Sequence, residues 1–138
     1  MTDTLTRFLA PQERDYPGAL AEIRAGHKRG HWIWYVFPQL AGLGRSERSE
    51  HYGLAGRQEA AAWLAHPVLG PHLVDISEAL LVHRGTPTER ILGGVDARKV
   101  QSCATLFAAL PGAPRVFDEI LDAFYGGRPC PETQRRLA

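Results

Sequence analysis

The sequence lacks the features of secreted, membrane-spanning and metal-binding proteins. It contains only two cysteines, Cys103 and Cys130, and neither belongs to a pair with metal-site or disulfide spacing. The N-terminal stretch MTDTLTRFLAPQERD has no apolar segment of the secretory type, and no apolar run approaches the ~20 residues of a membrane span. We therefore expect a cytoplasmic protein with two free thiols and no membrane partner.

The sequence also has no clear excess of positive or negative charge. Lysine and arginine number 16 against 15 aspartate and glutamate residues, so the formal net charge is +1. Extended nucleic-acid binding draws much of its affinity from neutralised phosphates and usually needs a clear basic excess. Nucleic acid is therefore not an expected partner, although a local basic patch and weak single-strand binding stay open.

Familiar catalytic and cofactor motifs are absent as well. The sequence has no Walker-type phosphate loop, dinucleotide fingerprint or GxSxG nucleophile elbow. His27 and His31 are four residues apart, but Gly30 lies between them and no HExxH motif or cysteine cluster accompanies them. We expect no cofactor and no metal site.

The sequence does contain enough apolar residues for one domain. Its 138 residues are 44% hydrophobic and 22% charged, the composition of an ordinary globular protein. No repeat, linker or low-complexity segment divides it, so we expect a single helical domain over residues 1–138. Nothing in the sequence specifies an oligomeric state.

Proline, glycine and capping residues predict an all-α fold, a compact array of about seven or eight short helices. Asp3 can cap a first helix that stops near Pro11, and Pro17 can open a second that ends at Gly26. Asp96 can cap a later helix with one apolar side. The other expected helices cover residues 46–52, 57–65, 68–83, 86–92 (with Thr86 as cap) and 114–125, and a final turn starts at Pro131. The most regular should be 68–83, 96–110 and 114–125.

The segment HWIWYVFPQ, residues 31–39, has the aromatic and β-branched content of a strand. A lone strand needs a partner for its backbone groups, and no second run of this kind exists. We therefore interpret residues 32–37 as a buried helical turn halted by Pro38. The large apolar residues that we expect in the core are Trp32, Phe37, Leu69, Leu73, Leu106, Phe107, Phe117 and Phe124.

Three motifs together resemble a known family. They are GHKRGHWIWYVFPQLAGLGRSERSEHY at 26–52, LAHPVLGPHL at 64–73 and DARKVQSCATLF at 96–107. Their order and spacing resemble the uncharacterised family named domain of unknown function eighteen-ten, which implies a small all-α protein and no specific activity. Some members carry the automatic label calpastatin. Calpastatin-type inhibitors are disordered repeat chains, whereas every expected helix here has an apolar stripe, so the resemblance does not imply that activity.

The first motif joins basic and aromatic residues. His27, Lys28, Arg29 and His31 are followed at once by Trp32, Trp34, Tyr35 and Phe37. Cations beside aromatic faces can hold a phosphate and stack a flat ring. The alternative, and the more common outcome, is that the aromatics are core and the cations a solvated rim. His31 needs a partner in either case, a ligand or a backbone carbonyl.

Two further groups have a functional and a plain interpretation. In Gly42-Leu43-Gly44-Arg45-Ser46 the glycines, a helix start capped by Ser46 and Arg45 can hold an anion, or they can form an ordinary turn. Lys99 lies at helical spacing from Asp96, Ser102 and Cys103, so it can activate a thiol. Cys103 can equally be a small packing residue.

Our leading hypothesis is a pocket for an anionic, nucleotide-like small molecule, in a binding protein or an enzyme, built from the motifs at 26–46 and 96–107. His31 is the best general acid or base and Lys99 the best electrostatic stabiliser, and both should approach Arg45 across a cleft. The alternative is a protein-interaction module that docks a partner through exposed aromatics of residues 32–37. The expected ligand-binding residues are Lys28, His31, Trp34, Gln39, Arg45, Ser46 and Lys99.

Overall fold

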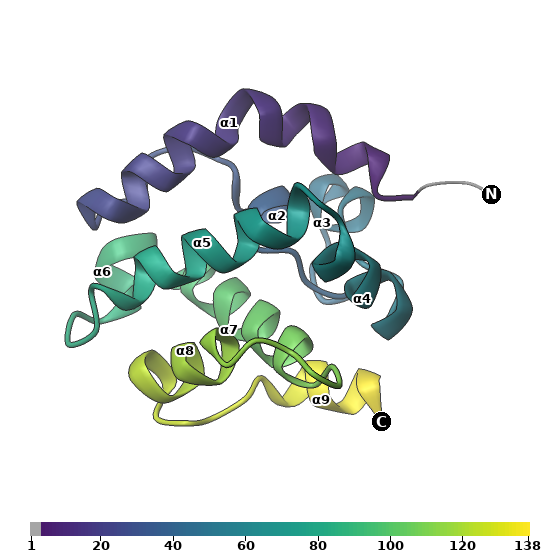
Figure 1. The fold of residues 1–138 in the computed structure, drawn as a ribbon. Helices are drawn as coiled ribbons and strands as arrows, with labels where there is room; N and C mark the ends of the chain where they lie inside the picture. The colour runs from purple at the N-terminus through teal and green to yellow at the C-terminus, as the bar shows by residue number, and fades with distance from the viewer. Residues whose placement is uncertain (1–3) are drawn as a thin grey trace.

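A computed structural model describes residues 4–138, in which nine helices and no strand occur (Figure 1). The expected all-α class is confirmed, and an isolated bridge between Leu40 and Leu54 is the extent of β pairing in these residues. The helices are α1 (Thr6–Ala25), α2 (Ile33–Val36), α3 (Glu47–His51), α4 (Arg57–Ala65), α5 (Leu69–Leu81), α6 (Thr88–Leu92), α7 (Gly94–Ala108), α8 (Val116–Tyr125) and α9 (Pro131–Leu137).

The helices stack in layers around α5. Helix α1 arches over α5, while α7 and α8 pair below it and α9 packs against α7 (Figure 1). Short α2 lies under α1, and α4 packs on both α5 and α7. No helix within residues 4–138 combines the length and apolar character that crossing a membrane requires.

The core fills the space between these layers. Seven of the eight predicted core residues are buried, among them Phe107 and Phe117, whose rings stack with centroids 5.4 Å apart. Phe124 is partly buried, so it lies at the margin of the core rather than inside it. It lies one residue before the end of α8 and packs against the core from the edge.

Helix α1 departs from the prediction of two short helices. It continues through Pro11 and Pro17 over 20 residues, although a proline inside a helix costs about 3 kcal/mol. Its inner face buries Phe8, Ala19 and Ile23 completely, and a buried large apolar side chain contributes roughly 1.5–3 kcal/mol. Tertiary packing therefore outweighs the local stop signals. The expected cap Asp3 lies outside the described residues.

Helices α6 and α7 also start differently from the prediction. Helix α6 begins at Thr88 after Pro87, so Thr86 is not its cap. Gly93 then takes a left-handed φ of 86°, which ends α6 and lets α7 begin at Gly94. Asp96 consequently lies inside the first turn of α7 rather than at its cap, and its carboxylate is available for other partners.

Two local predictions are confirmed. Residues Ile33–Val36 form the short buried helix α2, which ends before Pro38. The Ser46 side chain caps α3 by accepting a hydrogen bond of 3.1 Å from the backbone N–H of Ser49.

Candidate functional site

The only two lysines of the sequence meet at one carboxylate. Lys28 Nζ lies 2.8 Å from Asp96 Oδ2, and Lys99 Nζ lies 3.5 Å from Asp96 Oδ1. The side chains of Lys28, Lys99 and Asp96 are 7%, 18% and 17% exposed, so all three are largely withdrawn from water. One carboxylate therefore faces two cations in a setting where solvent screens them weakly.

The loop at residues 26–32 places Lys28 here. Gly26 ends α1 in the left-handed conformation, with φ of 79°, and turns the chain back. The Lys28 backbone N–H then donates to the Ile91 carbonyl at 2.7 Å, which ties the loop to the end of α6. The Lys28 ammonium also donates to the Gly30 carbonyl and lies 5.0 Å from the centre of the Trp32 ring.

Glu22 holds the same loop from within. Its Oε1 accepts hydrogen bonds from the backbone N–H groups of Arg29 and Gly30 and from the Trp32 indole, at 2.7, 2.9 and 3.0 Å. Burial raises the pKa of this carboxyl, but these donors and the Lys28 charge lower it by more, so the net pKa is below its ordinary value. Glu22 is therefore an ionised anchor for the loop.

Trp34 forms an aromatic wall beside the lysines. Lys99 Nζ lies 4.6 Å from the centre of the Trp34 ring, and Arg48 Cζ lies 5.0 Å from it. The ring is half-buried, and its Nε1–H is buried without a hydrogen-bond acceptor in residues 4–138. An unpaired buried donor costs free energy and invites an acceptor.

These side chains together present donors and positive charge beside one flat ring. Lys99 and Arg48 are cations, Trp34 Nε1 is an unused donor, and both oxygens of Asp96 are already taken by lysines. Such a set suits an oxyanion, phosphate above all, joined to a group that can lie against the indole. Within residues 4–138, no three His, Cys, Asp or Glu side chains come together as a metal site would need.

Three of the seven expected ligand-binding residues are brought together, namely Lys28, Trp34 and Lys99. His31 and Arg45 are exposed, and in the described part of the chain neither makes a hydrogen bond or ion pair with Lys99. Ser46 is engaged as the cap of α3. Gln39 is half-buried, and its carbonyl accepts from the Leu54 N–H at 2.9 Å.

Sequence reasoning missed three members of the site. Asp96 was assigned to a helix cap, and Arg48 and Glu22 were not singled out. The sequence does hold one signal for this cluster: lysine occurs only twice, once in each of two of the three family motifs, whereas arginine occurs throughout. Arg48 and Glu22 carry no such mark, because their roles depend on distance through space.

Burial decides whether Cys103 is a thiol activated by Lys99 or a packing residue. Cys103 is buried, and burial raises the pKa of its thiol well above the ordinary value. Ser102 is also buried and hydrogen-bonds the Thr133 hydroxyl at 2.7 Å, which joins α7 to α9. Both side chains are therefore packing residues, and Lys99 faces Asp96 instead.

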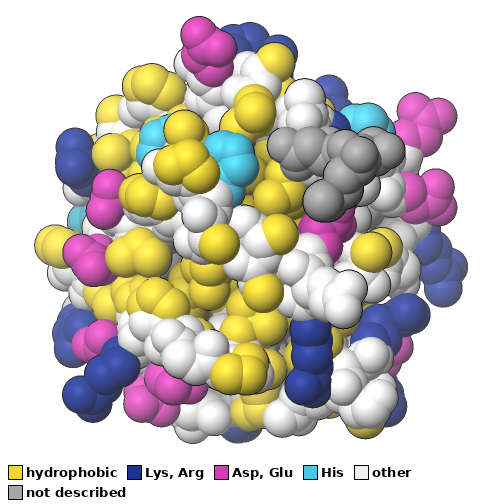
Figure 2. All heavy atoms as spheres, turned by 45° about the vertical axis from the view of Figure 1, so that its right-hand side comes forward, with side chains coloured by type: hydrophobic (Ala, Val, Ile, Leu, Met, Phe, Trp, Pro, Cys, Tyr) yellow, Lys and Arg dark blue, Asp and Glu magenta, His cyan; other side chains and the backbone are white. Residues whose placement is uncertain are grey.

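Grooves occur on another part of the surface. One of about 1190 Å³ is lined by α4, α9 and the loop at 40–41, and it includes Arg57, Glu59 and Arg136. A more apolar one of about 660 Å³ lies between α4, α5 and the loop at 110–114. Figure 2 brings this side forward, and hydrophobic side chains gather across its middle with most charged groups around the rim. None of the residues at the lysine pair lines either groove.

Comparison with known proteins agrees with the fold. A solved structure of the conserved hypothetical protein Rv1873 from Mycobacterium tuberculosis is 41% identical and superposes with a TM-score of 0.94, covering 96% of this chain and 95% of that one. No curated protein matches. The family model described as "Protein of unknown function (DUF1810)" matches residues 2–137. The chain therefore belongs to this family.

Proposed function

We propose that this protein binds a small anionic, nucleotide-like ligand at the site formed by Lys28, Trp34, Arg48 and Lys99 around Asp96. The observation that carries the proposal is the meeting of both lysines on one largely buried carboxylate, next to the half-buried ring of Trp34. A bound phosphate or carboxylate would accept hydrogen bonds from the cations, and the indole would support a flat ring.

Packing alone gives little reason for this arrangement. Two ammonium groups that share one carboxylate repel each other, and each loses hydration when it is withdrawn from water. The unpaired N–H of Trp34 adds a further cost. An anionic ligand would offset all three costs at once, so the same features that weaken the free protein favour binding.

The alternative, a docking face built from residues 32–37, has less support. Five of these six side chains are buried, and the sixth, Trp34, is half-buried beneath Arg48 and Lys99. A docking face needs several exposed aromatics in one flat patch. A single partly covered indole beside cations is better suited to a small ligand.

The proposal concerns binding, and no reaction is assigned. His31, the best acid or base by sequence, is exposed and makes no hydrogen bond within residues 4–138. A cytoplasmic location also stays a prediction, supported by the two unpaired cysteines.

A thermal-shift experiment tests the proposal. Inorganic phosphate, AMP, ADP and ADP-ribose are added in the millimolar range to the parent protein and to Lys99→Ala, Trp34→Phe and Arg98→Ala. A ligand that binds only the folded state raises Tm by mass action, so the parent should show a rise that grows with concentration. Lys99→Ala should lose it, and Trp34→Phe, which keeps a ring and removes the N–H, should reduce it.

Arg98→Ala is the matched control. Arg98 is exposed and adjacent to Lys99 on α7, so this variant removes one positive charge from the same helix without touching the site. The proposal is wrong if no compound raises Tm of the parent, or if Lys99→Ala responds as strongly as Arg98→Ala.

A further inference from the structure

We infer that Asp96 acts as an internal competitor of the ligand: its carboxylate holds Lys99 in the free protein, and a phosphate dianion replaces it there while Lys28 retains Asp96. The inference rests on the proposed function and adds two points to it. It assigns different roles to the two lysines, and it names the charge class of the ligand.

The two lysines are held with unequal strength. Lys28 Nζ is 2.8 Å from Asp96, also donates to the Gly30 carbonyl, and belongs to a residue whose backbone is tied to Ile91. Lys99 Nζ is 3.5 Å from Asp96, beyond the usual length of a charged hydrogen bond. Its other contact in the described residues is the face of Trp34. Lys99 is thus the cation that can change partner at small cost, and Lys28 is a positioning residue that keeps Asp96 in place.

The local charge favours a dianion over a monoanion. Lys28 and Lys99 both face the Asp96 carboxylate, and Arg48 lies against the same Trp34 ring as Lys99. Glu22 is close enough for the Lys28 charge to act on it, but its hydrogen bonds go to the N–H donors of its own loop, so it is no partner of Lys99. A monoanionic carboxylate ligand would merely exchange one unit of charge for another on Lys99. A terminal phosphate with two charges and three acceptor oxygens can bind Lys99 and Arg48 together. These contacts offset the free-energy cost of separating Lys99 from Asp96.

Removal of the competitor should therefore strengthen binding. Asp96→Asn keeps the size of the side chain and an acceptor oxygen but removes the negative charge, so Lys99 becomes free. We expect it to bind inorganic phosphate about tenfold or more tightly than the parent, each tenfold corresponding to about 1.4 kcal/mol. A residue that only positioned the lysines would give the opposite sign.

The experiment is isothermal titration of the full chain with inorganic phosphate and, separately, with acetate. The variants are Asp96→Asn, Lys99→Met, and Glu119→Gln, which removes one exposed negative charge from α8 as the matched control. We expect the parent and Glu119→Gln to bind phosphate equally and acetate far less, Asp96→Asn to bind phosphate more tightly, and Lys99→Met to bind neither.

A double variant keeps the test decisive if Asp96→Asn folds poorly. Lys28→Met with Asp96→Asn has the net charge of the parent and leaves Lys99 without its carboxylate, so it should bind phosphate at least as tightly as the parent. Lys28→Met alone leaves Asp96 entirely to Lys99 and should bind more weakly.

The outcomes separate the two proposals. If the parent binds phosphate and a normally folded Asp96→Asn binds it no more tightly, the inference fails while the proposed function stands. If Asp96→Asn folds poorly, weaker binding by the double variant than by the parent has the same meaning. Equal binding of acetate and phosphate by the parent overturns the assignment of a dianion. If neither the parent nor any variant binds either anion, the proposed function fails and the inference with it.

Discussion

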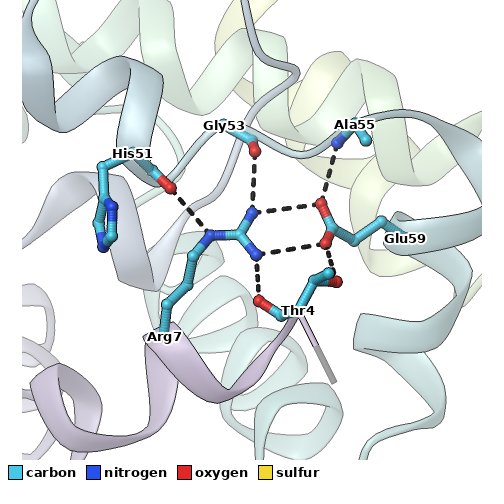
Figure 3. A network of polar contacts seen from close by, with 6 residues as sticks. All are labelled: Thr4, Arg7, His51, Gly53, Ala55 and Glu59. Carbon is cyan, nitrogen blue, oxygen red and sulfur yellow. Dashed lines mark hydrogen bonds and ion pairs between the residues drawn. The ribbon is translucent and has the colours of Figure 1, made fainter. Parts of the chain in front are cut away.

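Arg7 and Glu59 face each other in a two-pronged ion pair, with Arg7 Nη1 and Nη2 each 3.2 Å from one oxygen of the Glu59 carboxylate (Figure 3). Arg7 also donates to the carbonyls of His51 and Gly53, at 2.8 and 2.9 Å, and Glu59 accepts from the Ala55 N–H at 2.9 Å. The pair thus joins the start of α1 to α4 and to the chain between α3 and α4.

We predict that Arg7→Ala lowers the free energy of unfolding by about 2–4 kcal/mol, because it removes the cation from a largely buried carboxylate and leaves the carbonyls of Thr4, His51 and Gly53 without this donor. Urea denaturation measures the change. Arg14→Ala, on the same helix, removes an exposed partner of Asp15 and should cost far less than Arg7→Ala. Equal losses in the two variants would show that the Arg7 network adds no more than a surface pair.

The loss of folding stability at acidic pH should depend on Glu59. Burial raises the pKa of its carboxyl, but Arg7, Thr4 and the Ala55 N–H lower it by more, so the folded pKa lies below the ordinary 4.5. Such a group stabilises the fold fully above pH 4.5, and this stability is lost as pH falls through the folded pKa, at no more than about 1.4 kcal/mol per pH unit. Unfolding free energies measured between pH 6 and pH 3 should fall less steeply in Glu59→Gln. An unchanged slope would contradict the prediction.

His72 should affect folding stability in a higher pH range than Glu59 does. Its ring stacks on Tyr16 with centroids 3.7 Å apart, and its Nδ1 lies 2.7 Å from Gln12 Oε1. Burial lowers the pKa of His72 below the ordinary 6.5, and Asp75 opposes this only in part. The neutral ring is therefore favoured in the fold, so stability is greatest above pH 6.5 and declines as pH falls from there toward the folded pKa.

The check is urea unfolding at pH 7.5, 6.5 and 5.5. In His72→Gln the free energy of unfolding should decline less steeply with falling pH, because the glutamine at position 72 does not titrate. His31→Gln, at an exposed histidine, is the matched control. The two profiles would coincide if His72 were not the responsible group.

Truncation of the Phe107 side chain should destabilise the fold strongly. Phe107→Ala is expected to lower the free energy of unfolding by about 3–5 kcal/mol, because the ring is fully buried against Phe117 and a cavity remains. Val82→Ala, at a residue 78% exposed, should change it by less than about 0.5 kcal/mol. A loss below about 1 kcal/mol in Phe107→Ala would contradict the packing of α7 on α8.

The two thiols should react at different rates. Cys103 is buried and its pKa is raised, whereas Cys130 is half-buried at the start of α9. A thiol reagent added to the native protein at pH 7.5 should label Cys130 first and Cys103 only as the chain opens. Cys130→Ser should remove the fast phase, and rapid labelling that persists in it would show that Cys103 is accessible.

Local signals in the sequence determined much of the helix pattern. Ser46 caps α3, the step from His66 to Pro67 ends α4, and Pro38 follows α2, all as predicted. These signals act within about one helical turn, through a side-chain oxygen that meets a nearby N–H or a proline ring that blocks the next turn. Pattern and propensity at neighbouring residues are sufficient to place such features.

The candidate site also has members that the sequence indicated and members that only the structure shows. Residue type alone marked Lys28, Trp34 and Lys99, because cations and aromatics in distinctive motifs suit an anionic ligand. The sequence could not indicate that Arg48 covers Trp34 or that Glu22 anchors the loop, since these contacts join segments through space. His31 and Arg45 had the right chemistry, but the fold leaves both exposed.

What the sequence by itself determined, then, is an all-α chain with helix ends set by caps, glycines and prolines, and two lysines in motifs of anion-binding type. Only the tertiary structure decided that α1 continues through Pro11 and Pro17, because burial of its inner face exceeds the local cost of the two prolines. It also decided that Asp96 serves the lysines rather than a cap. Gly93 starts α7 before Asp96, and the loop after α1 brings Lys28 to within 2.8 Å of it.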